Sequence, residues 1–198
     1  MTAQEICTML KVSKEIPLYQ PIEMPDFDGW PVLQPCVERW NLIKSYLPNA
    51  KGTALDVGCH TGWFCRRLSH EGWRAIGFEQ SSDLVQIAES LNSFSGPIKP
   101  FYFVKDILQD KIPFCSVTLC LSIAMYLFDD VEAGWQAFDR ISAASDVMFL
   151  DFGGMYSDRL PFDEFTVEDM MFERTEFSSS QKLGYTDFES RPLFMFWK

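Results

Sequence analysis

Basic residues are scarce in this chain. Its 198 residues include 17 lysines and arginines against 28 aspartates and glutamates, which gives a formal net charge of −11. Proteins that bind a nucleic-acid backbone rely on clustered basic side chains, and Arg66-Arg67 is the only adjacent basic pair in the sequence. Nucleic acid is therefore an unfavourable partner, although a small basic patch can exist within an acidic total. A neutral or cationic small molecule fits the charge better.

Long apolar runs and histidines are scarce as well. No apolar run approaches the ~20 residues that span a bilayer, and the N-terminus has no basic region followed by an apolar one. We therefore expect a cytosolic protein without membrane association. His60 and His70 are the only histidines, and the six cysteines show no C-x-x-C spacing. We expect no metal site, and buried, reduced thiols.

Apolar and aromatic residues, in contrast, are abundant. Hydrophobic residues make up 47% of the chain, with 18 phenylalanines and six tryptophans. This composition is incompatible with disorder, and the length is that of one domain with a sizeable core.

The first 35 residues differ from the rest, and we expect them to form an N-terminal arm or lid on a domain that spans residues 36–198. Prolines at positions 17, 21, 25, 31 and 35 disfavour regular helix across this segment. Tyr19, Phe27 and Trp30 either cover the mouth of a ligand site or anchor the arm to the surface, and we favour anchoring.

The segment from Thr53 to Glu79 carries the strongest chemical signal. A short apolar run ends at Asp56, glycines follow at Gly58 and Gly62, and a second apolar run ends at Glu79. This pattern predicts a strand, a tight turn, a helix and a second strand. In an open α/β sheet, ligands bind at the carboxyl ends of the strands, where both acids and the turn fall.

The spacing within this segment indicates the class of ligand. Gly58 and Gly62 match neither the G-x-G-x-x-G turn that binds a pyrophosphate nor a phosphate loop ending in Lys-Ser/Thr. This spacing disfavours a nicotinamide-dependent oxidoreductase. Glu79, 23 positions after Asp56, suits hydrogen bonds to two ribose hydroxyls. We expect a nucleoside that carries no phosphate.

These residues resemble the class I S-adenosylmethionine-dependent methyltransferases. The run from Leu55 to Gly62 looks like their nucleotide-loop motif, and Glu79 stands at the position of their ribose-binding acid. Phe103 to Ile107 resembles the third strand, whose terminal acid and next apolar residue hold the adenine. Val117 to Ser122 resembles the fourth strand, beside the methyl group. The resemblance covers residues 37–198.

The resemblance implies a three-layer, Rossmann-like α/β fold. Its mostly parallel, seven-stranded sheet ends in an antiparallel C-terminal strand pair. It also implies S-adenosyl-L-methionine as the cofactor, with Arg39 either a ligand of the methionine carboxylate or simply an exposed residue. We favour a backbone role for His60. The cofactor-binding residues that it implies are Asp56, Gly58, Cys59, His60, Gly62, Trp63, Phe64, Glu79, Asp106, Ile107 and Ser122.

Helical periodicity places three helices in the first half of the domain. One spans residues 36–47, the second follows Gly62 with Arg66, Arg67 and His70 facing outward, and the third is capped by Asp83. Only about nine residues separate Asp106 from the fourth strand, too few for a crossover helix. We expect a loop there, which leaves the adenine side less covered than is usual in the resembling family.

The second half supplies the candidate catalytic residues. Tyr126 follows the fourth strand, and Asp151 ends a strand predicted over residues 146–152, after a helix that begins at Asp129 or Asp130. Either side chain can orient or deprotonate a methyl acceptor. Gly153-Gly154 is a hinge or a turn, and residues 156–175 form an insert or a short surface helix. Residues 177–184 and 192–198 are expected to form the closing strand pair.

We therefore predict methyl transfer from S-adenosylmethionine to a small-molecule acceptor. An RNA or protein methyltransferase, a catalytically inactive nucleoside-binding module and a structural protein are the alternatives. No segment of the sequence specifies the acceptor or an oligomeric state.

Overall fold

A seven-stranded sheet lies at the centre of the computed structural model, which describes residues 1–152, 158–186 and 188–198. The strand order is β3-β2-β1-β4-β5-β7-β6. β1 to β5 pair in parallel, whereas β7 is antiparallel to both β5 and β6. The strands are β1 Thr53–Val57, β2 Arg74–Glu79, β3 Phe101–Val104, β4 Cys115–Cys120, β5 Ser145–Asp151, β6 Ser179–Tyr185 and β7 Pro192–Trp197. This topology confirms the fold and the closing strand pair that we predicted.

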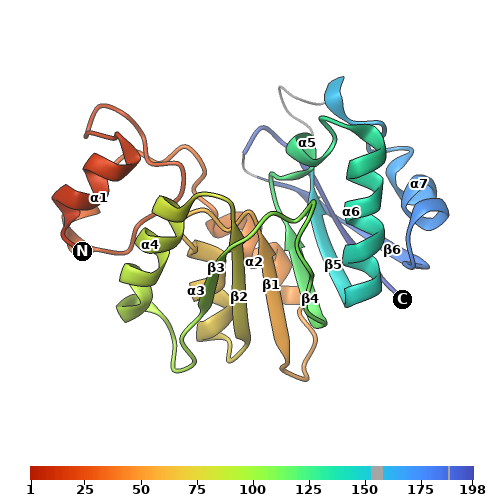
Figure 1. The fold of residues 1–198 in the computed structure, drawn as a ribbon, viewed down its shortest axis with the longest axis horizontal. Helices are drawn as coiled ribbons and strands as arrows, with labels where there is room; N and C mark the ends of the chain where they lie inside the picture. The colour runs from red at the N-terminus through yellow and green to blue at the C-terminus, as the bar shows by residue number, and fades with distance from the viewer. Residues whose placement is uncertain (153–157, 187) are drawn as a thin grey trace.

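Helices cover both faces of the sheet, so the fold has three layers (Figure 1). They are α1 Ala3–Leu10, α2 Val37–Tyr46, α3 Trp63–His70, α4 Ser82–Ser90, α5 Ala124–Leu127, α6 Val131–Ala144 and α7 Val167–Arg174, with 3-10 turns at Pro25–Phe27 and Leu91–Phe94. Alternation along β1 divides the core between the two faces. Leu55 and Val57 pack with the cluster under α5, α6 and α7, while Ala54 packs with the cluster under α2, α3 and α4.

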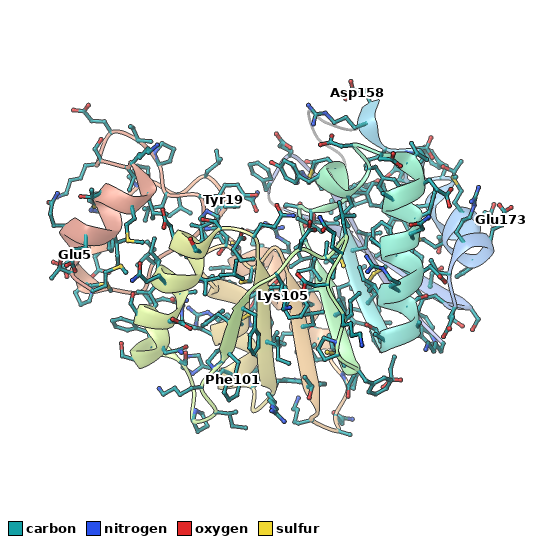
Figure 2. The ribbon with its side chains drawn as sticks, viewed as in Figure 1. Glu5, Tyr19, Phe101, Lys105, Asp158 and Glu173 are labelled. Atoms are coloured by element: carbon teal, nitrogen blue, oxygen red, sulfur yellow. The ribbon has the colours of Figure 1, made fainter. Side chains whose placement is uncertain are left out.

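The connection between β3 and β4 contains no crossover helix, as the spacing predicts. Arg140 of α6 holds this loop by donating from Nη2 to the carbonyl oxygen of Ile107 at 2.6 Å. Because β3 is also an edge strand, Phe101, Phe103 and Val104 remain 50%, 44% and 53% exposed. Phe101 lies at the opposite end of the sheet from Tyr19 (Figure 2).

The N-terminal arm contains a helix, which corrects our expectation for this segment. Helix α1 begins with a capping box, in which the side chain of Thr2 accepts from the amide of Glu5 and the Glu5 carboxylate accepts from the amide of Thr2. The first proline stands at position 17, so no proline interrupts α1. Ile6 is buried against residues of the arm and α4, and the red segment lies beside α4 in Figure 1.

The arm also explains why Arg66 is buried rather than facing outward as predicted. Glu23 of the arm crosses α3, and its carboxylate accepts from Arg66 Nε at 2.8 Å and from Arg67 Nη2 at 2.7 Å. The Arg66 side chain is 0% exposed and Arg67 retains 34% exposure. The helical pattern assigned Arg66 to the polar face, but the arm covers that face.

The ends of the other helices follow from local sequence. Ser81 caps α4 by accepting from the amide of Leu84 at 3.4 Å, so our assignment of the cap to Asp83 is wrong by two residues. Asp130 caps α6 by accepting from the amide of Ala133 at 2.9 Å, as predicted. Gly72 follows α3 with a φ of 84°, the left-handed conformation common after a helix.

Other sequence-based expectations concern thiols, metals and membranes. All six cysteines lie within the described ranges and none of them forms a disulfide. The described residues hold no group of three or more metal-ligating side chains. In the same ranges, no helix combines the length and apolar character that crossing a bilayer requires. Gly153, Gly154 and the start of the 156–175 insert lie outside the described residues; α7 occupies the later part of that insert.

Candidate functional site

A cavity of about 540 Å³ lies at the carboxyl ends of β1, β2 and β4. Strand order reverses between β1 and β4, and the crevice at such a reversal is the usual ligand site of an open α/β sheet. The volume falls in the range of roughly 300–1,000 Å³ that small-molecule sites occupy. The predicted residues that line it are Asp56, Gly58, His60, Phe64, Glu79, Ile107, Ser122 and Tyr126.

Five predicted residues do not line this cavity in the described chain: Cys59, Gly62, Trp63, Asp106 and Asp151. The side chains of Cys59 and Trp63 are buried in the core beneath α3. A Cβ on Gly62 would stand 2.6 Å from the ring of Tyr102, so Gly62 permits close packing of the helix start on β3. Cys59, Gly62 and Trp63 therefore form the turn and the start of α3 without facing the cavity.

The turn after β1 has backbone conformations that favour glycine. Gly58 has a φ of 69°, and a Cβ there would approach Ile123 Cδ1 to 2.8 Å. His60 is also left-handed, with a φ of 53°. The amides of Gly58 and Cys59 both donate to the carbonyl oxygen of Phe78, which ties the turn to the end of β2.

Glu79 ends β2 with its carboxylate held at the cavity by two backbone amides. Oε2 accepts from the His60 amide and Oε1 accepts from the Ser81 amide, each at 3.0 Å. A carboxylate oxygen has two lone pairs, so each oxygen can accept one further hydrogen bond. The backbone amide of His60 thus contributes to the site by holding the Glu79 carboxylate. Glu79 presents two acceptor oxygens at a fixed position.

Asp106 occupies a turn beside the cavity. Its Oδ1 accepts from the Leu108 amide and its Oδ2 from Gln109 Nε2, both at 2.9 Å. The next residue, Ile107, is 5% exposed and lines the cavity. The predicted adenine pair is thus split: the apolar residue faces the cavity and the acid holds the loop.

Asp56 is buried at the end of β1 with 2% exposure. Burial raises the pKa of this carboxyl to about 7, while a hydrogen bond from Cys65 and the positive charge of Arg39 act in the opposite direction. The group is therefore divided between its neutral and charged forms near neutral pH.

Asp56→Asn should stabilise the fold more at high pH than at low pH. The native pKa of about 7 lies above the ordinary value of 3.8, so the native state binds more protons and stability falls as pH rises between these values. The Asp56→Asn variant has no carboxyl at this position and so lacks this pH-dependent loss of stability. Its stability advantage in urea unfolding should grow by about 2–3 kcal/mol from pH 5 to pH 8. Asp83→Asn, at an exposed position, is the control. A stability difference between Asp56→Asn and the native protein that is equal at pH 5 and pH 8 would contradict the expectation.

A buried ion pair joins α2 to the end of β5. Arg39 Nη1 lies 2.6 Å from Asp151 Oδ2, and their side chains are 1% and 0% exposed. We expected Asp151 on the rim of the cavity, but its side chain is buried against Arg39 and does not line the cavity. Arg39 is not exposed, which excludes one of our two alternatives for it, and it lines the cavity. Asp151 also accepts from the Ser122 amide at 2.6 Å, and Ser122 takes a left-handed φ of 55°. Asp151 therefore fixes the chain after β4.

Three residues of the arm complete the wall of the cavity, and no sequence pattern pointed to two of them, Gln20 and Gln34. Gln34 Oε1 accepts from Arg39 Nη2 at 2.6 Å, which orients its amide so that Nε2 donates to the Tyr19 hydroxyl at 2.7 Å. Tyr19 therefore lines the cavity, contrary to the anchoring role that we favoured. Phe27, in contrast, anchors the arm by packing in the cluster with α4.

The rings of Tyr19, His60 and Tyr126 line the cavity. The rings of Tyr19 and His60 lie 4.8 Å apart. Burial lowers the pKa of His60 to about 4, so its imidazole is neutral at physiological pH. Burial raises the pKa of Tyr19, so its phenol stays protonated. Tyr126, on α5, is 54% exposed and also lines the cavity.

Solved structures that share this architecture include several methyltransferases. The bifunctional kinase-methyltransferase WbdD aligns over 97% of this chain with a TM-score of 0.78 at 16% identity. The magnesium protoporphyrin IX methyltransferase ChlM from Synechocystis PCC 6803, crystallised with bound S-adenosylmethionine, aligns over 82% of this chain and 76% of its own length, with a TM-score of 0.61 at 16% identity. The chain has the fold of the class I S-adenosylmethionine-dependent methyltransferases.

A third methyltransferase with this fold is the TehB-like S-adenosylmethionine-dependent enzyme from Corynebacterium glutamicum. It aligns over 80% of this chain and 85% of its own, with a TM-score of 0.59 at 17% identity. Our chain spans 46% of the length of WbdD, the first of these structures. No protein-family model and no curated protein matches the sequence.

Two features of the cavity suit the S-adenosylmethionine that this fold implies. Arg39 Nε and His60 Nδ1 are buried polar atoms of lining residues, and neither has a hydrogen-bond partner among the described residues. Buried polar groups are rarely left unpaired without a ligand or water. The Glu79 carboxylate faces the same space, so the donors and acceptors present fit a ligand with a ribose and a polar end.

Proposed function

We propose that this protein binds S-adenosylmethionine in the cavity at the ends of β1, β2 and β4 and transfers its methyl group to a small-molecule acceptor. The observation that carries the proposal is the Glu79 carboxylate, held by the amides of His60 and Ser81 on the methyltransferase fold. A preorganised carboxylate with free lone pairs at the end of the second strand suits two adjacent ribose hydroxyls.

In this proposal, three parts of the cavity hold the cofactor. Glu79 accepts from the ribose, and Ile107 packs against the adenine. Arg39 Nε and the Tyr19 hydroxyl bind the methionine carboxylate, because Gln34 already donates to the Tyr19 oxygen and leaves the phenol proton for another partner. Hydrogen bonds with a charged partner are the stronger class. The arm thus contributes to the cofactor site.

The bound cofactor supplies a sulfonium methyl group that is already activated for transfer. The residues of the chain then need to position the acceptor in line and exclude water, with a base required only if the acceptor loses a proton. Tyr126 is our candidate for orienting or deprotonating the acceptor, since it lines the cavity. Asp151 would act at a distance, by holding Arg39 and Ser122 in place.

A small-molecule acceptor is consistent with a cavity of about 540 Å³ and with the acidic total charge. Among the structural neighbours, the name of ChlM states such an acceptor, magnesium protoporphyrin IX, for that protein. The six cysteines form no disulfides, and free thiols suit a reducing compartment. We include a cytosolic location in the proposal on that ground.

S-adenosylmethionine and S-adenosylhomocysteine should both raise the melting temperature, whereas NAD should not. A ligand that binds only the native state at 100 times its dissociation constant adds about 2.7 kcal/mol, and each kcal/mol raises the melting temperature of a chain this long by roughly 2–4 °C. Differential scanning fluorimetry measures the shift. Stabilisation by NAD with no response to either adenosyl compound would refute the proposal.

A further inference from the structure

Gln34 is a buried side chain of the arm that contacts two other residues of the cavity wall, Tyr19 and Arg39. It lines the cavity itself and is 2% exposed. A side-chain amide has an acceptor oxygen at one end and donor hydrogens at the other. The direction in which this amide lies therefore decides whether each neighbour donates to it or accepts from it.

Arg39 determines the direction of the Gln34 amide. An arginine can only donate hydrogen bonds, so the atom that lies 2.6 Å from Arg39 Nη2 is the amide oxygen, Oε1. Arg39 is held in turn by Asp151, whose Oδ2 lies 2.6 Å from Nη1. The buried ion pair thus fixes the amide of Gln34 with its nitrogen toward Tyr19.

The Tyr19 hydroxyl consequently keeps its proton for another partner. Gln34 Nε2 donates to the phenol oxygen at 2.7 Å, and an amide nitrogen cannot accept a hydrogen bond in return. Burial raises the pKa of Tyr19, so the phenol stays protonated at neutral pH. Because Tyr19 lines the cavity, it offers a hydrogen-bond donor to a ligand there.

Arg39 adds a second donor to the same wall. Its Nε is buried and has no hydrogen-bond partner among the described residues. Gln34 contacts both Arg39 and Tyr19, which places the two donors close together. A pair of donors suits an anionic oxygen, whereas an ammonium group has only hydrogens to offer. The wall built around Gln34 therefore distinguishes between these two end groups of a ligand.

We propose that Gln34 makes the cavity selective for a cofactor that ends in a carboxylate, by directing the Tyr19 hydroxyl to donate. The inference rests on the proposed function, in which Tyr19 and Arg39 bind the methionine carboxylate of S-adenosylmethionine. Gln34 is a positioning residue, since it acts on this carboxylate through Tyr19 and Arg39. A ligand without the carboxylate leaves both buried donors unpaired, and sites of this kind reject such analogues strongly.

Three nucleosides that share the adenosine group test this selectivity. S-adenosylhomocysteine carries a carboxylate and an ammonium group, its decarboxylated analogue keeps only the ammonium group, and 5′-methylthioadenosine has neither. Each is titrated by calorimetry into the native protein. We expect the decarboxylated analogue to bind roughly tenfold or more weakly than S-adenosylhomocysteine, because Tyr19 and Arg39 lose their acceptor.

Gln34→Glu reverses the hydrogen bond to Tyr19 with little change in the size of the side chain. The glutamate accepts from Arg39 and from the Tyr19 hydroxyl, so the phenol proton no longer reaches the ligand, and its charge repels a carboxylate. The preference for S-adenosylhomocysteine over its decarboxylated analogue should fall roughly tenfold or more. The affinity for 5′-methylthioadenosine should stay unchanged. Gln86→Glu, which adds the same charge at an exposed position of α4, is the control and should keep the native preference.

Gln34→Met removes the amide without adding a charge. The preference should then fall several-fold, less than in Gln34→Glu, again without a change in the affinity for 5′-methylthioadenosine. A merely structural Gln34 would weaken all three nucleosides alike. That result, equal affinity of the native protein for S-adenosylhomocysteine and its decarboxylated analogue, or the native preference in a folded Gln34→Glu or Gln34→Met variant would overturn the inference. Failure of all three nucleosides to bind the native protein would refute the proposed function itself.

Discussion

Asp151→Asn should destabilise the fold by about 3–5 kcal/mol, because removal of one partner of a buried ion pair leaves the other charge uncompensated. Asp151 and Arg39 are 0% and 1% exposed, and their closest atoms lie 2.6 Å apart. The substitution also weakens the acceptor that holds the Ser122 amide. Urea unfolding followed by circular dichroism measures the loss.

A double variant distinguishes the energy of the interaction between Arg39 and Asp151 from the separate contributions of the two side chains. Arg39→Met combined with Asp151→Asn removes both charges, so its loss of stability should be smaller than the sum of the two single losses. Glu164→Gln is the matched control, because it breaks a partly exposed pair with Lys182 and should cost less than about 1 kcal/mol. A single Asp151→Asn variant as stable as the control would show that the pair does not hold β5 and α2 together.

Glu79→Ala should weaken the binding of S-adenosylhomocysteine roughly tenfold to a hundredfold. Loss of a charged hydrogen-bond partner costs about 1.5–3 kcal/mol, and this carboxylate also positions the amides of His60 and Ser81 at the cavity. Titration calorimetry measures the affinity, and circular dichroism establishes that the variant is folded.

Asp83→Ala is the control for Glu79→Ala. Asp83 is an exposed acid in the first turn of α4, close in sequence to Glu79, and its removal changes the local charge without removing a group that faces the cavity. Its affinity should equal that of the native protein. Unchanged affinity in a folded Glu79→Ala variant would exclude the ribose-binding role that we assign to this residue.

The segment from Asp56 to Glu79 could be predicted from the sequence because its determinants are local. Apolar runs that end in acids, with glycines between them, specify a strand, a turn, a helix and a strand within one short stretch of chain, Thr53 to Glu79. Parallel strands bring their carboxyl ends to one edge, so the acids share a site. The structure confirms this succession of strand, turn, helix and strand and places Asp56 and Glu79 on the same cavity.

Predictions that assigned polar residues to the surface were less successful. The periodicity of α3 puts Arg66 on a polar face, and the prolines of the arm suggested a segment without helix. The helix of the arm, α1, lies before the first proline at position 17, so the prolines do not bear on it. The periodicity of α3 did not show that the arm covers Arg66. Glu23 reaches Arg66 from 43 residues earlier in the chain, and helical periodicity contains no information about a partner so distant.

The sequence by itself thus determined the class of the fold, the glycine turn and the acids at the ends of the first two strands, since each depends on neighbours within a few residues. Only the tertiary structure decided the partners of buried charges. Arg39 and Asp151 are 112 residues apart, and Tyr19 meets His60 because the arm folds across α3 and α4. A charge is buried only where folding brings it an opposite charge or a hydrogen-bond partner, and strand order, rather than local pattern, determines which residues meet.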